Sequence, residues 1–168
     1  MLKFNFRKGW YVLYTKPKHE KKVNLAFQEM GIASYLPMFK ELRTWKDRKR
    51  YIEMPLFPSY IFVYLNNVQE YFKSLDNYGV FYFLRIGKEI ARINDEVIIQ
   101  IHKIVESCVD LEISTHKFVP GRNLVITDGV FSGLNCEIVK YNGRDRILVR
   151  INLLERNLLV SLNHELIV

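Results

Sequence analysis

Alternating apolar and polar positions predict several β-strands in the first half of the chain. In the stretch WYVLYTK, residues 10–16, the residues Trp10, Val12 and Tyr14 would share one face, because successive side chains of a strand point to opposite sides. Further strands are predicted over residues 32–39, with a sheet edge or a bulge at Pro37, and over residues 80–86.

The most apolar run of the chain is MPLFPSYIFVYL, residues 54–65. A strand is predicted from Ser59 onward, because β-branched and aromatic residues follow one another there. Tyr60, Phe62 and Tyr64 would share one face of this strand, and the aliphatic residues between them would form the other. Both faces are apolar, whereas an antiparallel sheet in a small domain commonly buries only one. Something must therefore cover the second face.

Three segments have the spacing of amphipathic helices. Residues 17–31 place apolar side chains on one side and lysines on the other, with Pro17 suited to the first turn and Gly31 to the C-terminal cap. A second helix is predicted over residues 67–78, before Gly79, and a third over residues 94–107, which open with Asn and two acidic residues.

The segment KELRTWKDRKRYIE, residues 40–53, has no helical stripe. It predicts an extended hairpin with a basic tip, and Trp45 would lie near that tip. The alternative for Trp45 is packing at the base of the hairpin.

The last third of the chain has a different pattern. Residues 108–118 interrupt the periodicity and are interpreted as a linker, and short alternating strands separated by DG, SG and NG turns follow. We therefore predict an α+β N-terminal domain over residues 1–107, in which helices flank an antiparallel sheet, and a small all-β barrel over residues 119–168.

The positive charge lies in the first third of the chain. The net charge is +7, yet residues 1–53 hold 13 Lys and Arg against 5 Asp and Glu, while the remainder holds 12 against 13. Such asymmetry indicates contact with a polyanion, most often nucleic acid. The alternative is a solvated basic face that aids solubility.

The residues carry no recognisable catalytic or metal-binding motif. P-loop, GxGxxG, HExxH and GxSxG patterns are absent, the four histidines are scattered, and the carboxylates are dispersed. Cys108 and Cys136 stand apart and are interpreted as buried thiols in a reducing compartment. We expect no enzyme, cofactor or metal.

The chain also lacks a secretory h-region or an apolar run near 20 residues, so we expect a cytoplasmic location without membrane association.

Two stretches resemble one known family. WYVLYTKPKHEKKV and PLFPSYIFV are similar to the N-terminal domain of NusG-type transcription factors, and residues 120–141 resemble the KOW motif of the same family. The Trp-Lys-Asp-Arg-Lys run at residues 45–49 is most similar to specialised RfaH-like and UpxY-type antiterminators of capsular polysaccharide loci. The resemblance implies an elongation and antitermination factor. The alternatives are a housekeeping NusG factor and a ribosome-associated KOW protein that binds RNA.

The resemblance also implies sites and partners for this expected monomer. RNA polymerase would dock its clamp helices, a coiled coil of the largest subunit, against an apolar depression. The positions that match this depression are Tyr14, Phe57, Tyr60, Ile98 and Ile101. The alternative for all five is an ordinary core role, which stays open for Ile98 and Ile101. For Phe57, which lies between two prolines just before the strand, docking is favoured.

Upstream or non-template DNA would meet basic residues, with Trp45 available to stack on a base. The positions are Lys16, Lys18, Lys21, Lys22, Arg43, Trp45, Lys46, Arg48, Lys49 and Arg50. In the KOW domain, Phe131 and Leu134 match apolar positions that contact a small-subunit ribosomal protein or Rho, and filling of the small barrel is their alternative role.

Overall fold

The computed structural model describes residues 5–107 and five later strands, at residues 111–114, 122–125, 135–141, 144–151 and 156–161. The chain divides into two compact units, residues 1–98 and 99–168, and each is described by itself.

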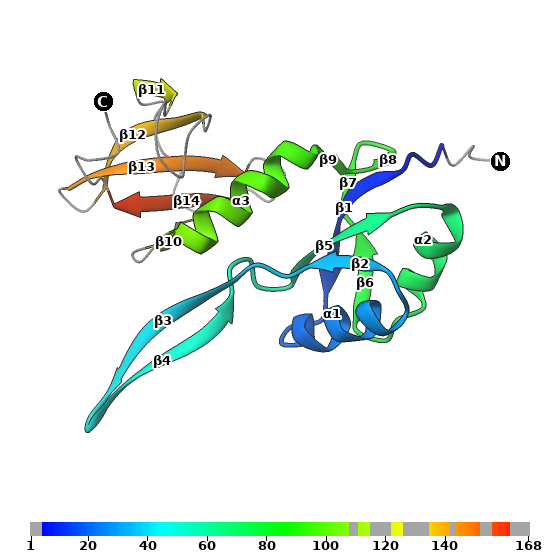
Figure 1. The fold of residues 1–168 in the computed structure, drawn as a ribbon, viewed down its shortest axis with the longest axis horizontal. Helices are drawn as coiled ribbons and strands as arrows, with labels where there is room; N and C mark the ends of the chain where they lie inside the picture. The colour runs from blue at the N-terminus through cyan, green and yellow to red at the C-terminus, as the bar shows by residue number, and fades with distance from the viewer. Residues whose placement is uncertain are drawn as a thin grey trace. The chain divides into compact units, whose positions relative to one another are not determined.

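The first unit is built on an antiparallel sheet with the strand order β2-β5-β1-β6 (Figure 1). Of its central strands, β1 was predicted from alternating apolar positions and β5 from its run of β-branched and aromatic residues. Strand β9 also pairs with β1. The bounds are β1 (Gly9–Thr15), β2 (Ala33–Tyr35), β5 (Tyr60–Leu65), β6 (Val80–Phe83) and β9 (Arg92–Ile93).

Two of the predicted strands are shorter than expected. Strand β2 ends before Pro37 and lies at the sheet edge, as the proline predicted. The strand predicted over residues 80–86 is broken at Leu84, whose N–H donates to the carbonyl of Val12. Beyond this break, β7 (Arg85–Ile86) pairs with β8 (Glu89–Ile90) in a separate ribbon.

The three predicted helices are present with corrected ends: α1 (Glu20–Glu29), α2 (Val68–Leu75) and α3 (Asp95–Ser107). Helix α1 begins after Pro17 rather than at it, because Lys18 has a left-handed φ of 63°, which interrupts a helix. At its other end Gly31, with φ 70°, allows the N–H of Ile32 to donate to the carbonyl of Phe27 at 2.9 Å. Helix α2 stops three residues before its predicted end.

One face of β5 belongs to the hydrophobic core. Its aliphatic residues pack in one cluster with Val23 and Phe27 of α1 and Tyr71 of α2. Tyr11 of β1 lies in the same core and donates a hydrogen bond to the carbonyl of Arg7. Burial raises the pKa of the Tyr11 hydroxyl, against smaller lowering effects of this bond and of nearby arginine charges. The helices thus cover the aliphatic side of β5, and the side with its aromatic residues points the other way.

The predicted basic hairpin is present and is two residues longer at each end. It consists of β3 (Met38–Trp45) and β4 (Arg48–Pro55), joined by Lys46 and Asp47. Among the described residues these two strands pair only with each other, and they form a ribbon apart from the main sheet (Figure 1).

In the second unit, the described strands form one antiparallel sheet in the order β10-β14-β13-β12-β11. Leu111–Ser114, within the segment predicted to be a linker, instead form β10 and pair with β14. Closure into a barrel stays a prediction, and Phe131 and Leu134 lie outside the described residues. The other bounds are β11 (Arg122–Val125), β12 (Asn135–Tyr141), β13 (Arg144–Ile151) and β14 (Arg156–Ser161).

Candidate functional site: an aromatic face and a basic hairpin

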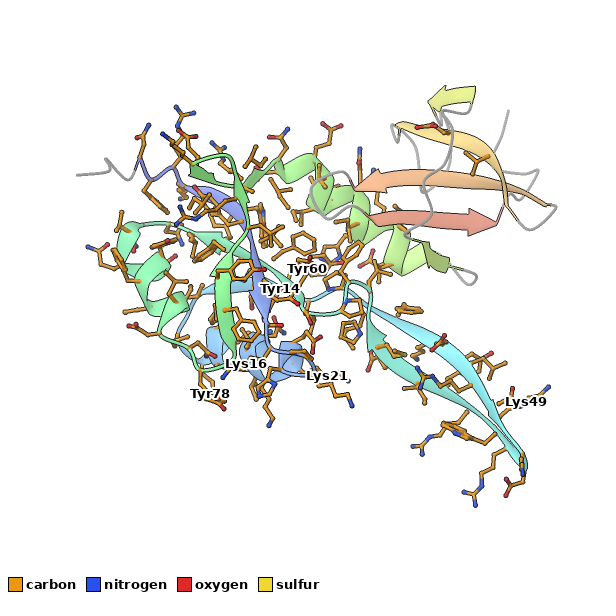
Figure 2. All side chains as sticks on the ribbon, turned by 180° about the vertical axis from the view of Figure 1, so that it is seen from behind. Tyr14, Lys16, Lys21, Lys49, Tyr60 and Tyr78 are labelled. Atoms are coloured by element: carbon orange, nitrogen blue, oxygen red, sulfur yellow. The ribbon has the colours of Figure 1, made fainter. Side chains whose placement is uncertain are left out.

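The strand register gathers aromatic rings on the sheet face opposite to the helical core. Tyr14 lies directly across from Tyr60 on one side and from Tyr82 on the other. The ring centroids are 5.4 Å apart for Tyr14 and Tyr60, and 5.1 Å apart for Tyr14 and Tyr82. Figure 2 shows Tyr14 and Tyr60 next to each other. Such clusters offer large, rigid contact area to a protein partner.

A bulge in β6 adds a fourth ring to this face. Tyr14 pairs with Tyr82 and Thr15 pairs with Val80, so Phe81 is an extra residue without a partner in β1. Its ring stacks on Tyr14 at 5.8 Å. Phe81 and Tyr82 are 51% and 53% exposed. We call Tyr14, Tyr60, Phe81 and Tyr82 the aromatic face.

Sequence reasoning missed Phe81 and Tyr82. Strict alternation would send these neighbours to opposite faces, and only the bulge brings both to the side of Tyr14. The run VFYF gave a signal for a strand but none for a bulge.

The other three predicted polymerase contacts are buried. Phe57, Ile98 and Ile101 are 1%, 4% and 0% exposed, respectively. The ring of Phe57 meets that of Phe62 edge to face, with centroids 6.1 Å apart. In the structure described, these three side chains have packing roles, and their contact with a partner stays a prediction.

Ser59 fixes the entry into β5 and so the position of Tyr60. Its φ of 67° is left-handed, a conformation that costs a residue with a Cβ about 1–2 kcal/mol. The N–H of Ser59 donates to Oε1 of Glu20 at 2.7 Å, and its carbonyl accepts the N–H of Thr15 at 2.8 Å. Glu20 is only 5% exposed. The buried carboxylate thus ties the loop before Tyr60 to the start of α1.

Glu20→Ala is expected to lower the free energy of unfolding by about 1–3 kcal/mol, because the partly buried N–H of Ser59 loses its acceptor. Thermal or urea denaturation would measure this loss. Glu20→Gln keeps an acceptor oxygen and serves as the control, so it should cost less than Glu20→Ala. Equal costs for the two variants would contradict the role of this hydrogen bond.

The first group of predicted DNA contacts lies around the beginning of α1. Lys21 and Lys22 are exposed in its first turn, while Lys16 and Lys18 precede the helix instead of starting it. The ammonium of Lys16 is 3.2 Å from the ring centroid of Tyr78, which is 79% exposed (Figure 2). Sequence reasoning missed Tyr78, because its position just before Gly79 indicated only the end of a helix.

The second group lies on the hairpin. Trp45 is 50% exposed next to the turn, so the alternative that it packs at the hairpin base is wrong. Arg43 donates to Oε2 of Glu41 at 3.1 Å, and Lys46 stands in the turn itself. Lys49 and the remaining arginines are also exposed. This ribbon therefore presents a dense positive charge to solvent.

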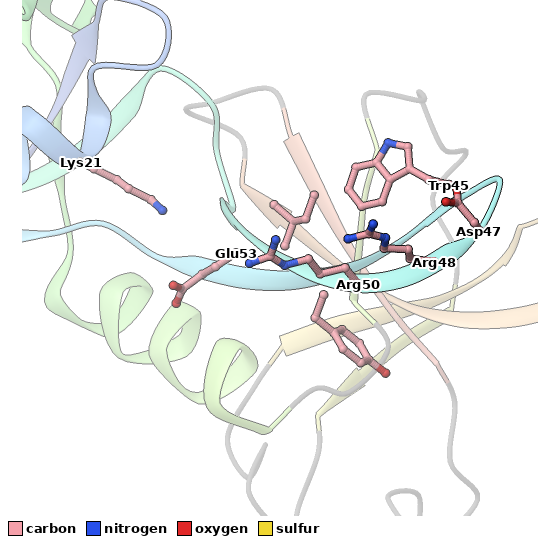
Figure 3. A pocket seen from close by; sticks show the side chains of 8 residues that line it. Lys21, Trp45, Asp47, Arg48, Arg50 and Glu53 are labelled. Carbon is pink, nitrogen blue, oxygen red and sulfur yellow. The ribbon is translucent and has the colours of Figure 1, made fainter.

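An open hollow of about 690 Å³ connects the two basic groups (Figure 3). Lys21 of α1 contributes to its lining, and every other lining residue comes from the hairpin. The lining residues are Lys21, Trp45, Asp47, Arg48, Arg50, Tyr51, Ile52 and Glu53.

The part of the chain that the structure describes contains no group of three or more His, Cys, Asp or Glu that could hold a metal ion. Within the same residues, no helix is long and apolar enough to cross a membrane.

Comparison with known proteins assigns the fold and the family. The family described as "Transcription termination factor nusG" matches residues 8–102, which include α1, α2, the whole hairpin and the aromatic face. The chain belongs to the NusG family. The NusG-type resemblance read from WYVLYTKPKHEKKV and PLFPSYIFV is thereby confirmed.

Curated relatives extend the similarity beyond this first unit. The "Transcription termination/antitermination protein NusG" of Chlamydia trachomatis serovar D and that of Chlamydia muridarum are each 27% identical to this NusG-family chain over 157 residues. The alignments cover 84% of the chain and 85% of each relative. A solved structure titled "Domain interaction in Thermotoga maritima NusG" is similar with a TM-score of 0.53 and 20% identity, covering 92% of this chain and 94% of the other.

These findings define the class of the protein. It is a NusG-family transcription termination/antitermination factor with an α+β fold. Membership in this family agrees with the expectation that the chain is not an enzyme.

Proposed function

We propose that this NusG-family factor binds RNA polymerase through the aromatic face and suppresses pausing or termination during elongation. The observation that carries the proposal is the cluster of four contacting rings on the sheet face away from the helical core, in which Phe81 and Tyr82 are exposed and Tyr14 and Tyr60 half-buried. Soluble proteins rarely leave such aromatic surface without a partner.

The proposed partner surface is the tip of the clamp helices in the largest polymerase subunit. A helical tip offers apolar side chains in short rows, which fit between rigid aromatic rings. Tyr14 lies at the centre of the four rings and would contact the middle of this tip. Residues at the centre of an interface, where water is excluded, contribute most to affinity.

Nucleic acid at the upstream edge of the transcription bubble is the second proposed partner. Lys21 and Lys22 are exposed on α1, and the hairpin carries the other predicted cations. The lysines among them would neutralise phosphates without reading sequence. Tyr78, held beside Lys16, adds an exposed ring on which an unpaired base could stack.

The proposal predicts that the full chain retains core RNA polymerase from a nuclease-treated lysate. The expected result is co-purification of the large polymerase subunits, since the aromatic face needs no nucleic acid for docking. Mass spectrometry of the bound fraction would measure it. Recovery of ribosomes without polymerase would contradict the proposal and favour the ribosome-associated alternative.

We further propose a specialised role at particular operons, such as polysaccharide loci. The Trp-Lys-Asp-Arg-Lys run at the hairpin tip supports this role. The chlamydial NusG relatives, which align over most of the chain, favour a general elongation factor as the second candidate. Transcript profiling after deletion separates the two. Loss of the distal genes of one operon supports the specialised role, and broad changes support the general factor.

A further inference from the structure

The two faces of the β3–β4 hairpin differ in chemistry. Register places Arg43 opposite Arg50 and Trp45 opposite Arg48, and these four alternate positions share one face. All four side chains are exposed. We call this set the arginine face.

The opposite face carries lysine in place of arginine. Leu42 lies across from Tyr51, Thr44 across from Lys49, and Lys40 across from Glu53. We call the face with Lys40 and Lys49 the lysine face. The hairpin thus places its three guanidinium groups on one face and the ammonium groups of Lys40 and Lys49 on the other, with Lys46 in the turn. Attraction to phosphate alone would require no such separation.

The arginine face holds positive charge that the fold does not neutralise. Arg43 has an ion pair with Glu41, but among the described residues no carboxylate lies within ion-pair distance of Arg48 or Arg50. Like charges directly opposite each other, such as Arg43 and Arg50, destabilise a pair of strands. A two-stranded ribbon is itself only marginally stable. This arrangement therefore favours an anionic partner on that face.

We propose that the arginine face enters the major groove of double-stranded DNA, an inference that rests on the proposed function. The major groove of B-form DNA admits a two-stranded β-ribbon, and this ribbon has strands of eight residues. The planar fork of arginine matches the O6 and N7 acceptors of guanine, whereas lysine acts as a point charge. Arg48 and Arg50 read base edges, and the lysine face remains toward phosphate and solvent.

Two other nucleic-acid forms fit the arginine face less well. Proteins that bind single strands stack successive bases on several aromatic rings, but this face has Trp45 alone, and Tyr51 lies on the opposite face. Double-stranded RNA has a deep, narrow major groove that side chains do not read. The geometry therefore favours duplex DNA.

Matched variants of the full chain test the assignment. Arg48→Gln/Arg50→Gln removes two charges from the arginine face, and Lys40→Gln/Lys49→Gln removes two from the lysine face. Fluorescence anisotropy with a labelled mixed-sequence DNA duplex measures affinity at constant salt. We expect the arginine variant to lose about tenfold or more, because it loses two bidentate base contacts and each contributes about fivefold or more. The lysine variant should lose about threefold or less.

Replacing every guanine of the duplex by 7-deazaguanine removes the N7 acceptor and leaves the phosphates unchanged. Wild-type affinity should fall, and the arginine variant should no longer distinguish the two duplexes. Any of four results would overturn the inference. The two matched variants could lose affinity equally, or 7-deazaguanine could leave the wild-type affinity unchanged. The chain could also fail to bind the DNA duplex, or could bind single-stranded DNA or duplex RNA more tightly. Retained co-purification of polymerase in any of these cases would leave the proposed function standing.

Discussion

Tyr60→Ala/Tyr82→Ala is expected to weaken binding of core RNA polymerase by roughly 30-fold or more, because truncating one aromatic hot spot removes about 2 kcal/mol of binding free energy or more. Both rings contact Tyr14, one on each side, so the double variant removes half of the aromatic face. Biolayer interferometry with immobilised polymerase would measure the loss.

The matched control is Phe72→Ala on α2. Phe72 is 56% exposed, close to the value for Tyr82, but it lies outside the aromatic face. It should retain wild-type affinity. Near-ultraviolet circular dichroism establishes that both variants remain folded. Undiminished polymerase binding by a folded double variant would remove the aromatic face from the proposal.

Phe57→Ala is expected to lower the free energy of unfolding by about 3–5 kcal/mol, the usual cost of truncating a buried phenylalanine. Phe57 is 1% exposed, and its ring packs against that of Phe62. The variant would therefore lose polymerase binding through loss of folding, whether or not Phe57 touches the partner. Urea denaturation followed by circular dichroism measures the change.

Phe57→Leu separates packing from direct contact. Leucine keeps most of the buried volume, so the expected cost in unfolding free energy is about 1 kcal/mol. If packing is the role of Phe57, the folded variant binds polymerase almost as wild type does. A large loss of affinity in this folded variant would instead establish Phe57 as a docking residue.

The longer elements of the first unit followed from local patterns, but the two-residue strands β8 and β9 and several ends did not. Gly31 marks the end of α1, since glycine adopts a left-handed conformation without a Cβ clash. The start of α1 was missed, because Lys18 adopts a positive φ that propensity does not anticipate. The strand predicted over residues 80–86 also broke where Leu84 bonds to β1. Such ends depend on hydrogen bonds to distant strands.

Candidate residues divide in a similar way. Alternation assigned Tyr14 and Tyr60 each to a face of its own strand, and the strand register placed the two opposite each other on one sheet face. The flanking prolines favoured Phe57 as a docking residue, yet its side chain is buried against the ring of Phe62, and residue types next to Phe57 do not reveal this packing. Trp45 was placed near the hairpin tip correctly, since the segment pairs with itself around a two-residue turn and its register therefore depends on neighbouring residues alone.

The sequence by itself determined the alternation of the strands, the concentration of charge in the first 53 residues and the family resemblance. These properties reside in neighbouring residues or in simple counts, so no fold is needed to read them. Only the tertiary structure decided that Phe81 and Tyr82 join Tyr14, that Glu20 holds Ser59, and that the arginines and lysines of the hairpin separate onto two faces. Each of these depends on strand register or on a contact between segments far apart in the chain, which side-chain periodicity does not specify.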